Sequence, residues 1–204
     1  MALNMQDAIS QRLREHGQVN VVIAGMSCSG KTTLANRIYE VYSARYPVAL
    51  IAQDDYYKNL ADIPRAPQGY LTDSLHAFHT LEFKRDAKML LTYGAAFVPT
   101  YDMRSNTRLD KSRIVGVGSI NVFEGLHTVH LLRELENSLG IYVDTDVGTC
   151  LERRIARDTA AYGVSEVRIR QYWEECIKPM AEELILPQKA LADIIINGKG
   201  GDFL

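Results

Sequence analysis

Short apolar runs alternate along the chain with longer segments in which apolar residues recur every three or four positions. The short runs are continuous and rich in Val and Ile, which is typical of strands buried on both faces. They lie at 20–24, 48–52, 120–123, 140–143 and 193–196. The segments with helical periodicity lie at 31–44, 81–93, 129–137, 149–160 and 166–185. This alternation predicts a parallel α/β sheet covered by helices.

Two regions depart from the pattern. Residues 54–79 contain two prolines and many polar groups, so they are expected to form a long loop. Residues 97–119 resemble a hairpin rather than a helix. Loops this long in a compact domain are usually functional. We therefore expect one domain, residues 1–204, with an insertion at about 97–119 on the substrate side.

Composition narrows the class of protein. An apolar fraction of 47% and a charged fraction of 24% are ordinary for a globular domain. The net charge of −2 gives no basic field, so nucleic acid is not an expected partner. Three cysteines without framework spacing favour free thiols in a reducing cytoplasm. The polar first residues resemble an amphipathic helix rather than a signal peptide, and no stretch has the length of a membrane span.

The run GMSCSGKTT has the spacing of a phosphate-binding loop and stands in the required context, after a strand and before a helix. Backbone N–H groups and the helix N-terminus then face the phosphates, Lys31 neutralises charge, and the Thr32 hydroxyl ligates Mg²⁺. Cys28 is read as a small space-filling residue rather than a reactive thiol. The predicted ATP-binding residues are Gly25, Ser27, Cys28, Ser29, Gly30, Lys31, Thr32 and Thr33.

Two acidic positions close apolar runs. Asp54 follows the second predicted strand, where ligands of open α/β sheets bind, so it is a candidate general base; a capping or turn role is the alternative. Asp55 is its neighbour, and Asp54 lies nearer the strand end. Glu124 ends the third predicted strand and is the candidate carboxylate on the Mg²⁺ side, with a turn residue as the alternative.

The segment CLERRIARD places Arg154 and Arg157 on one helical face. They can stabilise charge on a transferring phosphoryl group or form a solvated charged face, and spacing alone leaves both alternatives open. His127 and His130 share a helical spacing that would suit zinc, but no third ligand is near in the sequence.

Taken together, GMSCSGKTT, QDDYY, PTYDMRSNTR, FEGLH, RRIARD and LPQKALADIIIN make the chain similar to the uridine kinase branch of the phosphate-loop kinases. The resemblance covers about residues 19–197. It implies a five-stranded parallel sheet with helices on both faces and a small lid, at about 153–165. It also implies ATP with Mg²⁺ as phosphoryl donor and the 5′-hydroxyl of a nucleoside as acceptor. Members of the family often associate, so the resemblance leaves both a homo-oligomer and a monomer as alternatives.

The resemblance also assigns roles by position. Asp54 corresponds to the base, with Lys31 and Arg157 also catalytic, and Thr32 and Glu124 hold magnesium. The implied substrate-binding residues are Tyr57 near the sugar, Asp73 on the ribose hydroxyls, Tyr101 in the base pocket and Arg154.

The chain departs from the family pattern around the acceptor. Ser74 and Leu75 replace a His-Pro pair, Met103 and Asn106 stand where an aromatic residue and a histidine are usual, and residues 162–164 replace Arg-Gly-Arg. Nicotinamide riboside kinase shares the stretch after the second strand but generally lacks the PTYD hairpin and the ADIII ending, so it ranks second after uridine kinase. Phosphoribulokinase ranks third.

Proteins of other classes fit the sequence less well. A GTPase switch would carry an Asn-Lys-x-Asp motif, which the sequence lacks. An ATP-binding regulatory protein with little turnover is disfavoured by the presence of Lys31, Thr32, Asp54 and Glu124 together. The prediction is therefore an enzyme, a nucleoside kinase.

Overall fold

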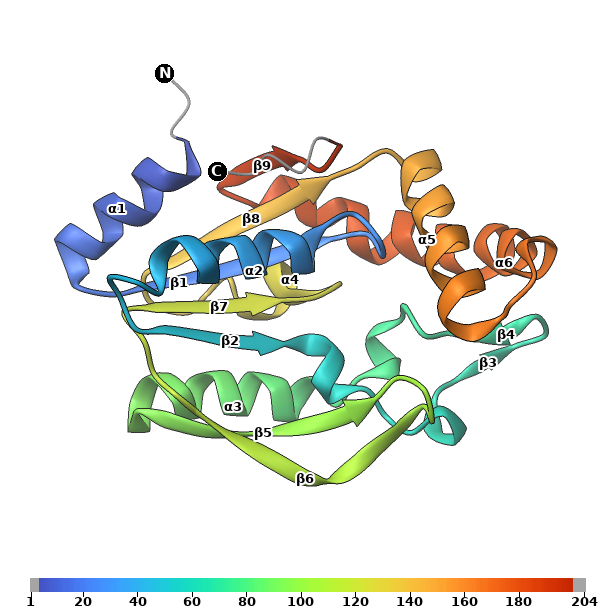
Figure 1. Ribbon diagram of the computed structural model, residues 1–204, viewed down its shortest axis with the longest axis horizontal. Coiled ribbons are helices and arrows are strands. Elements are labelled where there is room, and N and C mark those ends of the chain that lie inside the picture. Colours follow the sequence, from blue (N-terminus) through green and yellow to red (C-terminus); the bar gives the residue numbers. More distant parts are fainter. Residues whose placement is uncertain (1–3, 200–204) are drawn as a thin grey trace.

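A five-stranded parallel sheet forms the centre of the molecule, which the computed structural model describes from residue 4 to residue 199 (Figure 1). The strand order is β2-β7-β1-β8-β9, and all four neighbouring pairs are parallel. The strands are β1 (Val19–Gly25), β2 (Val48–Ala52), β7 (Ile120–Glu124), β8 (Ser138–Asp144) and β9 (Ile194–Asn197). Each matches one predicted run, so the predicted sheet is confirmed.

Helices cover both faces of this sheet because β1 contributes to two separate cores. Val21 and Ile23 pack with α1 (Met5–His16) and α2 (Lys31–Tyr42) on one face. Val22 packs on the opposite face with residues of α3 (Thr80–Tyr93), α4 (Thr128–Leu132) and the helical segment that follows Tyr172. Since alternate residues of a strand point to opposite faces, β1 carries apolar residues on both of its faces, with Asn20 as its one polar member.

The C-terminal helices are less regular than their sequence pattern predicts. After α5 (Val147–Tyr162) and α6 (Glu166–Tyr172), the chain continues through π-helical turns at Trp173–Ile177 and Ala181–Ile185 around the short α7 (Lys178–Met180) and then a 3₁₀ stretch, Leu186–Leu191. A single regular α-helix over 166–185 is therefore wrong; Pro179, which has no N–H to donate, lies within α7. The predicted helix at 129–137 is also shorter, and ends at Leu132.

The region after β2 lies outside the central sheet and contains its own short elements. Residues expected to be loop contain short 3₁₀ turns, including Gln53–Tyr56, and the small hairpin β3 (Arg65–Ala66) and β4 (Gly69–Tyr70). The predicted insertion is an antiparallel hairpin of β5 (Ala95–Asp102) and β6 (Thr107–Gly116).

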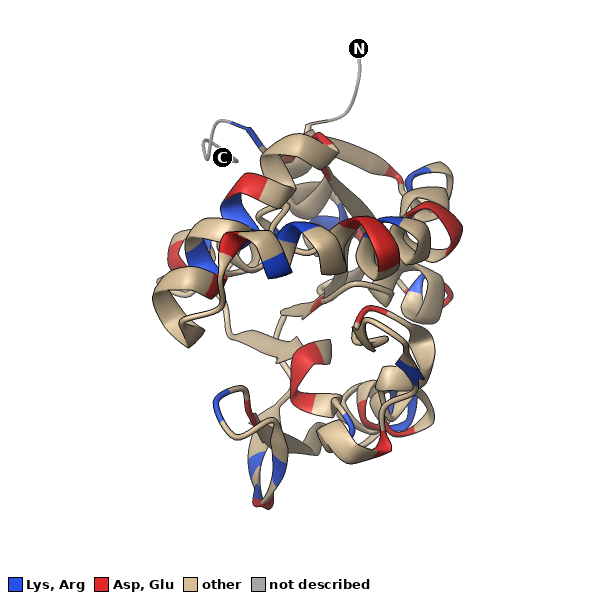
Figure 2. Cartoon of the chain, turned by 90° about the vertical axis from the view of Figure 1, so that its right-hand side faces the viewer, with Lys and Arg blue, Asp and Glu red and all other residues tan. Residues whose placement is uncertain are grey.

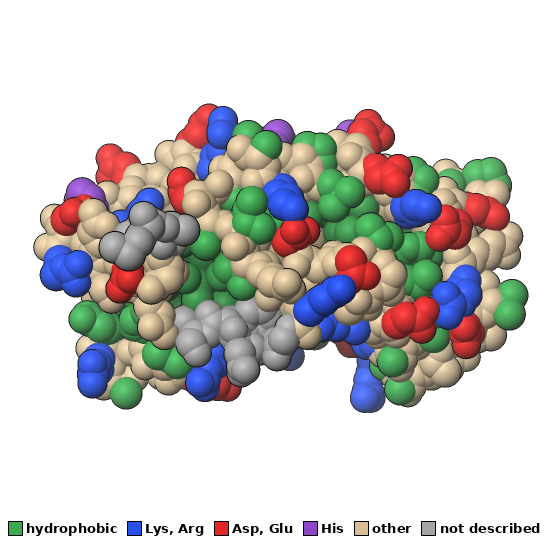
Figure 3. All heavy atoms as spheres, turned by 90° about the horizontal axis from the view of Figure 1, so that it is seen from above, with side chains coloured by type: hydrophobic (Ala, Val, Ile, Leu, Met, Phe, Trp, Pro, Cys, Tyr) green, Lys and Arg blue, Asp and Glu red, His purple; other side chains and the backbone are tan. Residues whose placement is uncertain are grey.

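The surface agrees with the balanced composition. Acidic and basic side chains are interspersed over the face seen in Figure 3. Within residues 4–199, no helix has the length and apolar character needed to cross a membrane.

Candidate active site

The register of the sheet brings the predicted catalytic segments to one edge. Glu124, at the end of β7, pairs with Ile23 of β1 on one side and with Ala52 of β2 on the other. The phosphate loop leaves β1 at this edge, and Asp54 follows β2. Figure 2 looks onto this end of the molecule, where acidic and basic residues both occur. Side chains from three strands therefore meet where an open α/β sheet binds ligands.

The phosphate loop has the tight geometry that its glycines predict. A Cβ added at Gly25 would lie 2.7 Å from both Ser29 Oγ and the Val143 carbonyl oxygen. Gly30 has a φ of 108°, and α2 begins at the next residue. Cys28 also has positive φ, 63°, which is uncommon for a residue with a side chain. The sequence interpretation of Cys28 as a mere space filler omits this backbone strain.

Lys31 and Thr32 lie at the start of α2 beside the loop. Lys31 Nζ donates to the Met26 carbonyl oxygen at 2.8 Å, which folds the lysine back along the loop. Thr32 Oγ1 donates to Glu124 Oε1 at 3.1 Å. The hydroxyl and the carboxylate therefore converge on one point. Hard oxygen donors of this kind suit Mg²⁺, so these residues fit the ion that the resemblance implies.

Hydrogen bonds from distant side chains hold the backbone of the phosphate loop, and the sequence interpretation missed them. Arg153 donates through Nη1 to the carbonyl oxygens of Cys28 and Ser29, both at 3.3 Å, and through Nη2 to Gly198 at 2.9 Å. Thr145 Oγ1 donates to the Ser29 carbonyl oxygen at 2.8 Å. Segments after β8 and β9 and on α5 therefore fix the shape of a loop more than a hundred residues earlier in the chain.

The two aspartates after β2 have different surroundings. Asp55 Oδ2 accepts from Arg113 Nη2 of the hairpin at 3.0 Å, whereas Asp54 lines the cavity. Burial, followed by the nearby charge of Asp73, raises the pKa of Asp54 against the opposing effect of Lys31. Burial and the charge of Asp54 raise the pKa of Glu124 in the same way. Bound cationic charge would relieve this repulsion.

The cavity at this edge has a volume of about 1300 Å³ and runs from the phosphate loop to the hairpin tip. Such a volume accommodates a nucleotide together with a small acceptor, since ligand pockets measure about 300–1000 Å³ for one ligand. The structure places most predicted site residues on its wall. The predicted residues that line it are Ser27, Cys28, Gly30, Lys31, Thr32, Thr33, Asp54, Tyr57, Asp73, Tyr101, Glu124, Arg154 and Arg157. Gly25 and Ser29 shape the loop from beneath.

Asp73 and Arg154 form a buried pair deep in the acceptor half. Arg154 Nη1 lies 3.7 Å from Asp73 Oδ1, too far for a hydrogen bond, while its Nε lies 3.3 Å from Asp158 Oδ2. Among the described residues, neither Asp73 Oδ2 nor Arg154 Nη1 has a hydrogen-bond partner, although both atoms are buried. Buried polar atoms are normally paired, so these two point to a polar ligand.

Aromatic rings line the path from this pair to the hairpin. The ring centroid of Tyr57 lies 4.1 Å from that of Phe78 and 5.4 Å from that of Tyr101. Arg104, which the sequence interpretation did not select, adds a positive charge at the hairpin tip. Arg157 lies closer to solvent and donates from Nε to Asp158 Oδ1 at 2.7 Å.

His127 supports this site rather than a metal. Its Nε2 lies 2.8 Å from the Asp73 carbonyl oxygen, and its backbone N–H donates to Gln53 Oε1 at 2.9 Å. Burial lowers the pKa of His127 to about 4, so the ring is neutral and Nε2–H can donate. His130 lies exposed on α4, so the two histidines do not converge as the zinc alternative required.

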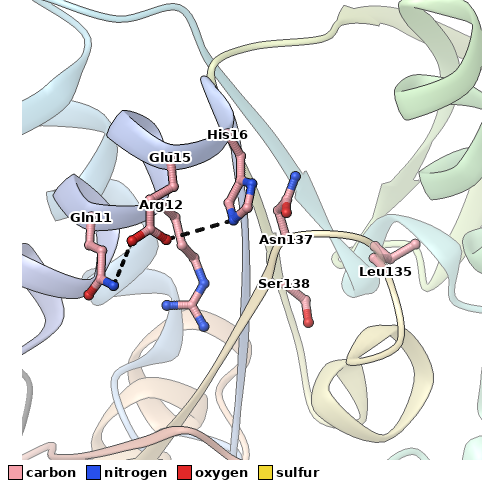
Figure 4. Close-up of a pocket in the computed structure, with 7 residues that line it drawn as sticks. All are labelled: Gln11, Arg12, Glu15, His16, Leu135, Asn137 and Ser138. Atoms are coloured by element: carbon pink, nitrogen blue, oxygen red, sulfur yellow. Dashed lines mark hydrogen bonds and ion pairs between the residues drawn. The ribbon is translucent and has the colours of Figure 1, made fainter.

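A second hollow lies at the opposite end of the sheet (Figure 4). It has a volume of about 540 Å³, and residues of α1, among them Arg12 and His16, line it together with Leu135, Asn137 and Ser138 before and at the start of β8. This is the amino end of the parallel strands, away from the phosphate loop. It therefore takes no part in the site described above.

Comparison with known proteins agrees with the geometry. A model of the Phosphoribulokinase / Uridine kinase family matches residues 21–200. A uridine kinase from Bacillus pumilus is 35% identical over 186 residues, which are 89% of this chain and 87% of that protein. A uridine kinase from Lactobacillus johnsonii is 33% identical over 183 residues, 88% of this chain and 86% of that protein.

Solved structures show the same fold. The phosphoribulokinase of Rhodobacter spheroides superimposes with a TM-score of 0.59 at 17% sequence identity, over 90% of this chain and 73% of that one. At this identity the likeness supports the phosphate-loop kinase fold alone. The family match and the two curated relatives go further: the chain belongs to the phosphoribulokinase/uridine kinase family and is a phosphate-loop kinase.

Proposed function

We propose that the protein transfers the γ-phosphoryl group of ATP to the 5′-hydroxyl of a pyrimidine nucleoside, uridine or cytidine. The observation that carries the proposal is the buried pair of Asp73 and Arg154. Within residues 4–199, Asp73 Oδ2 and Arg154 Nη1 have no hydrogen-bond partner, and Nη1 lies 3.7 Å from the other carboxylate oxygen, Oδ1. An acceptor and a donor placed this close together match the neighbouring hydroxyls of a ribose, which both donate and accept. The uridine kinases among the relatives support the same acceptor.

The residues around Asp54 supply the chemistry. Asp54 accepts the proton of the acceptor hydroxyl as its oxygen attacks the γ-phosphorus and ADP leaves. Because its pKa is raised, Asp54 is a stronger base than an ordinary aspartate. Lys31 and Arg157 offset the charge on the transferring group, and residues 153–165 act as the lid. Thr32 and Glu124 would hold Mg²⁺, which supplies charge neutralisation at the outer phosphates when bound.

The hairpin end favours a neutral base over a cationic one. Tyr57 and Tyr101 offer aromatic surface to a planar ring, and Arg104 adds a positive charge to the same end of the cavity. That charge repels the cationic ring of nicotinamide riboside but tolerates the carbonyl groups of a pyrimidine. We therefore rank the pyrimidine nucleosides first.

An acceptor panel tests the proposal. ADP release by the purified protein is measured with ATP and Mg²⁺ against uridine, cytidine, nicotinamide riboside, purine nucleosides and ribulose phosphate. Turnover is expected with uridine or cytidine, and 5′-deoxyuridine is the matched control that lacks the acceptor hydroxyl. ADP release that is the same with and without every acceptor would refute the kinase proposal. Preferred turnover of nicotinamide riboside would refute the choice of base.

A further inference from the structure

We propose that Tyr172 is a positioning residue for the acceptor, which orients Asp73 and Arg154 without lining the cavity itself. The inference rests on the proposed function, because it assigns Asp73 and Arg154 to the acceptor. Tyr172 is the last residue of α6 and lies behind the buried pair. Its ring contacts Arg154, and its hydroxyl reaches Asp73 indirectly, through Thr72.

The hydroxyl of Tyr172 holds the segment that carries Asp73. It lies within hydrogen-bonding distance of two oxygens, the Tyr70 carbonyl oxygen and, at 3.0 Å, Thr72 Oγ1. The ring packs on Gly69, where an added Cβ would lie 3.0 Å from Cε2 of the tyrosine. Hairpin β3–β4 and the residues after it are therefore fastened to α6, a helix a hundred residues later in the chain.

Thr72 passes this constraint to the carboxylate. Its Oγ1 donates to Asp73 Oδ1 at 3.1 Å, so its only proton is used there. The proton of Tyr172 then goes to Thr72 Oγ1 or to the Tyr70 carbonyl oxygen, and either bond fixes the same short segment. With Oδ1 held in this way, Oδ2 is the oxygen left free for the acceptor.

The ring of Tyr172 acts on the other member of the pair. The guanidinium carbon of Arg154 lies 5.8 Å from the ring centroid, within the range of about 6 Å for a cation–π contact. Arg154 is also drawn by Asp158 on its own helix. Tyr172 thus sets the distance between Asp73 and Arg154 without lining the cavity. A change at this residue should therefore weaken acceptor binding more than nucleotide binding.

Steady-state kinetics of Tyr172→Phe test this role, because phenylalanine keeps the ring and removes only the hydroxyl. We expect the KM for the nucleoside to rise about tenfold, while the KM for ATP stays within about twofold of the wild-type value. Thr72→Val should have a similar effect. The double variant should be no worse than the stronger single variant, since both changes break one chain of contacts. Tyr142→Phe is the matched control, a buried tyrosine of β8 whose hydroxyl lacks a partner within the described residues.

The outcomes separate the two proposals. An unchanged nucleoside KM in Tyr172→Phe would overturn the positioning role. So would a rise in both KM values accompanied by a lower melting temperature, because that pattern indicates a structural role alone. Additive effects in the double variant would also overturn the relay through Thr72. If the wild-type protein turns over no nucleoside, the proposed function fails, and this inference fails with it.

Discussion

His127 makes the stability of the fold depend on pH in a direction that can be worked out. The residue is 1% exposed, and its Nε2 lies 2.8 Å from the carbonyl oxygen of Asp73. Burial lowers the pKa from 6.5 to about 4, which the contact with Asp73 only partly offsets. The folded protein therefore keeps the ring neutral, whereas the unfolded chain protonates it near its ordinary pKa.

The sign and the magnitude follow from this difference. Between pH 6.5 and about 4 the unfolded state binds more protons, so the free energy of unfolding falls as the pH falls through that window. A fall in the pKa from 6.5 to about 4 corresponds to a full loss of about 3 kcal/mol below pH 4, of which about 2 kcal/mol is lost between pH 7 and pH 5. That is a large fraction of the stability of a typical domain.

Urea unfolding at pH 7 and pH 5 measures the effect. Other groups titrate in this range, so the wild-type protein is compared with His127→Gln, whose amide can still donate to the Asp73 carbonyl oxygen but does not titrate. The variant should lose about 2 kcal/mol less than the wild-type protein over this interval. His130→Gln, a change at an exposed histidine, should retain the wild-type dependence. Equal losses in the wild-type protein and His127→Gln would refute the reasoning.

Four further changes test the donor half of the site. Asp54→Asn should lower turnover at least about a hundredfold with little change in ATP affinity; a fully active variant would exclude Asp54 as the base. Lys31→Ala should weaken both ATP binding and turnover by about tenfold or more, and undiminished activity would be incompatible with the phosphate-loop assignment. Glu124→Gln should raise the Mg²⁺ concentration needed for half-maximal turnover by about tenfold; an unchanged Mg²⁺ titration would remove Glu124 from the metal side. Gly198→Ala places a Cβ 2.0 Å from Thr145 Oγ1 and should weaken ATP binding about tenfold. Gly148→Ala is its control, because the added Cβ has its nearest neighbour at 3.4 Å and should leave ATP binding unchanged. Equal ATP affinities in the two variants would contradict the inference that this region supports the phosphate loop.

Patterns of neighbouring residues in the sequence were sufficient to predict the strands of the sheet and the phosphate loop. The apolar runs predicted all five strands of the sheet, because a strand buried on both faces admits no polar alternation. The glycine spacing predicted the phosphate loop, and its position after a strand fixed the edge at which it would lie. Asp54 and Glu124 were predicted for the same reason, since the ends of parallel strands meet at one edge.

The remaining parts depend on contacts between distant segments, which spacing along the chain does not encode. Arg153 reaches the carbonyl oxygen of Cys28 across 125 positions, and Tyr172 reaches Thr72 across 100. Arg153 lies in the predicted lid beside Arg154, but nothing in the local sequence indicates that it turns to the phosphate loop, and nothing near Tyr172 marks it as part of the site. His127 drew attention through its spacing to His130, but its partner is the backbone of Asp73, 54 positions earlier. The roles of the individual site residues stay predictions until the variants are measured.

The support behind the phosphate loop has a consequence for how the protein is made. The loop joins β1 to α2, and these elements leave the ribosome before α5 and β9 because synthesis runs from the N-terminus. Its carbonyl groups, however, accept hydrogen bonds from Thr145 and Arg153, and Arg153 is itself held by the carbonyl oxygen of Gly198. A nascent chain that has not yet exposed Gly198 has the whole nucleotide motif without the segments that give it shape. The growing polypeptide therefore acquires a nucleotide site of native shape only after residue 198 has left the ribosome, and ATP can stabilise the fold only from that point on.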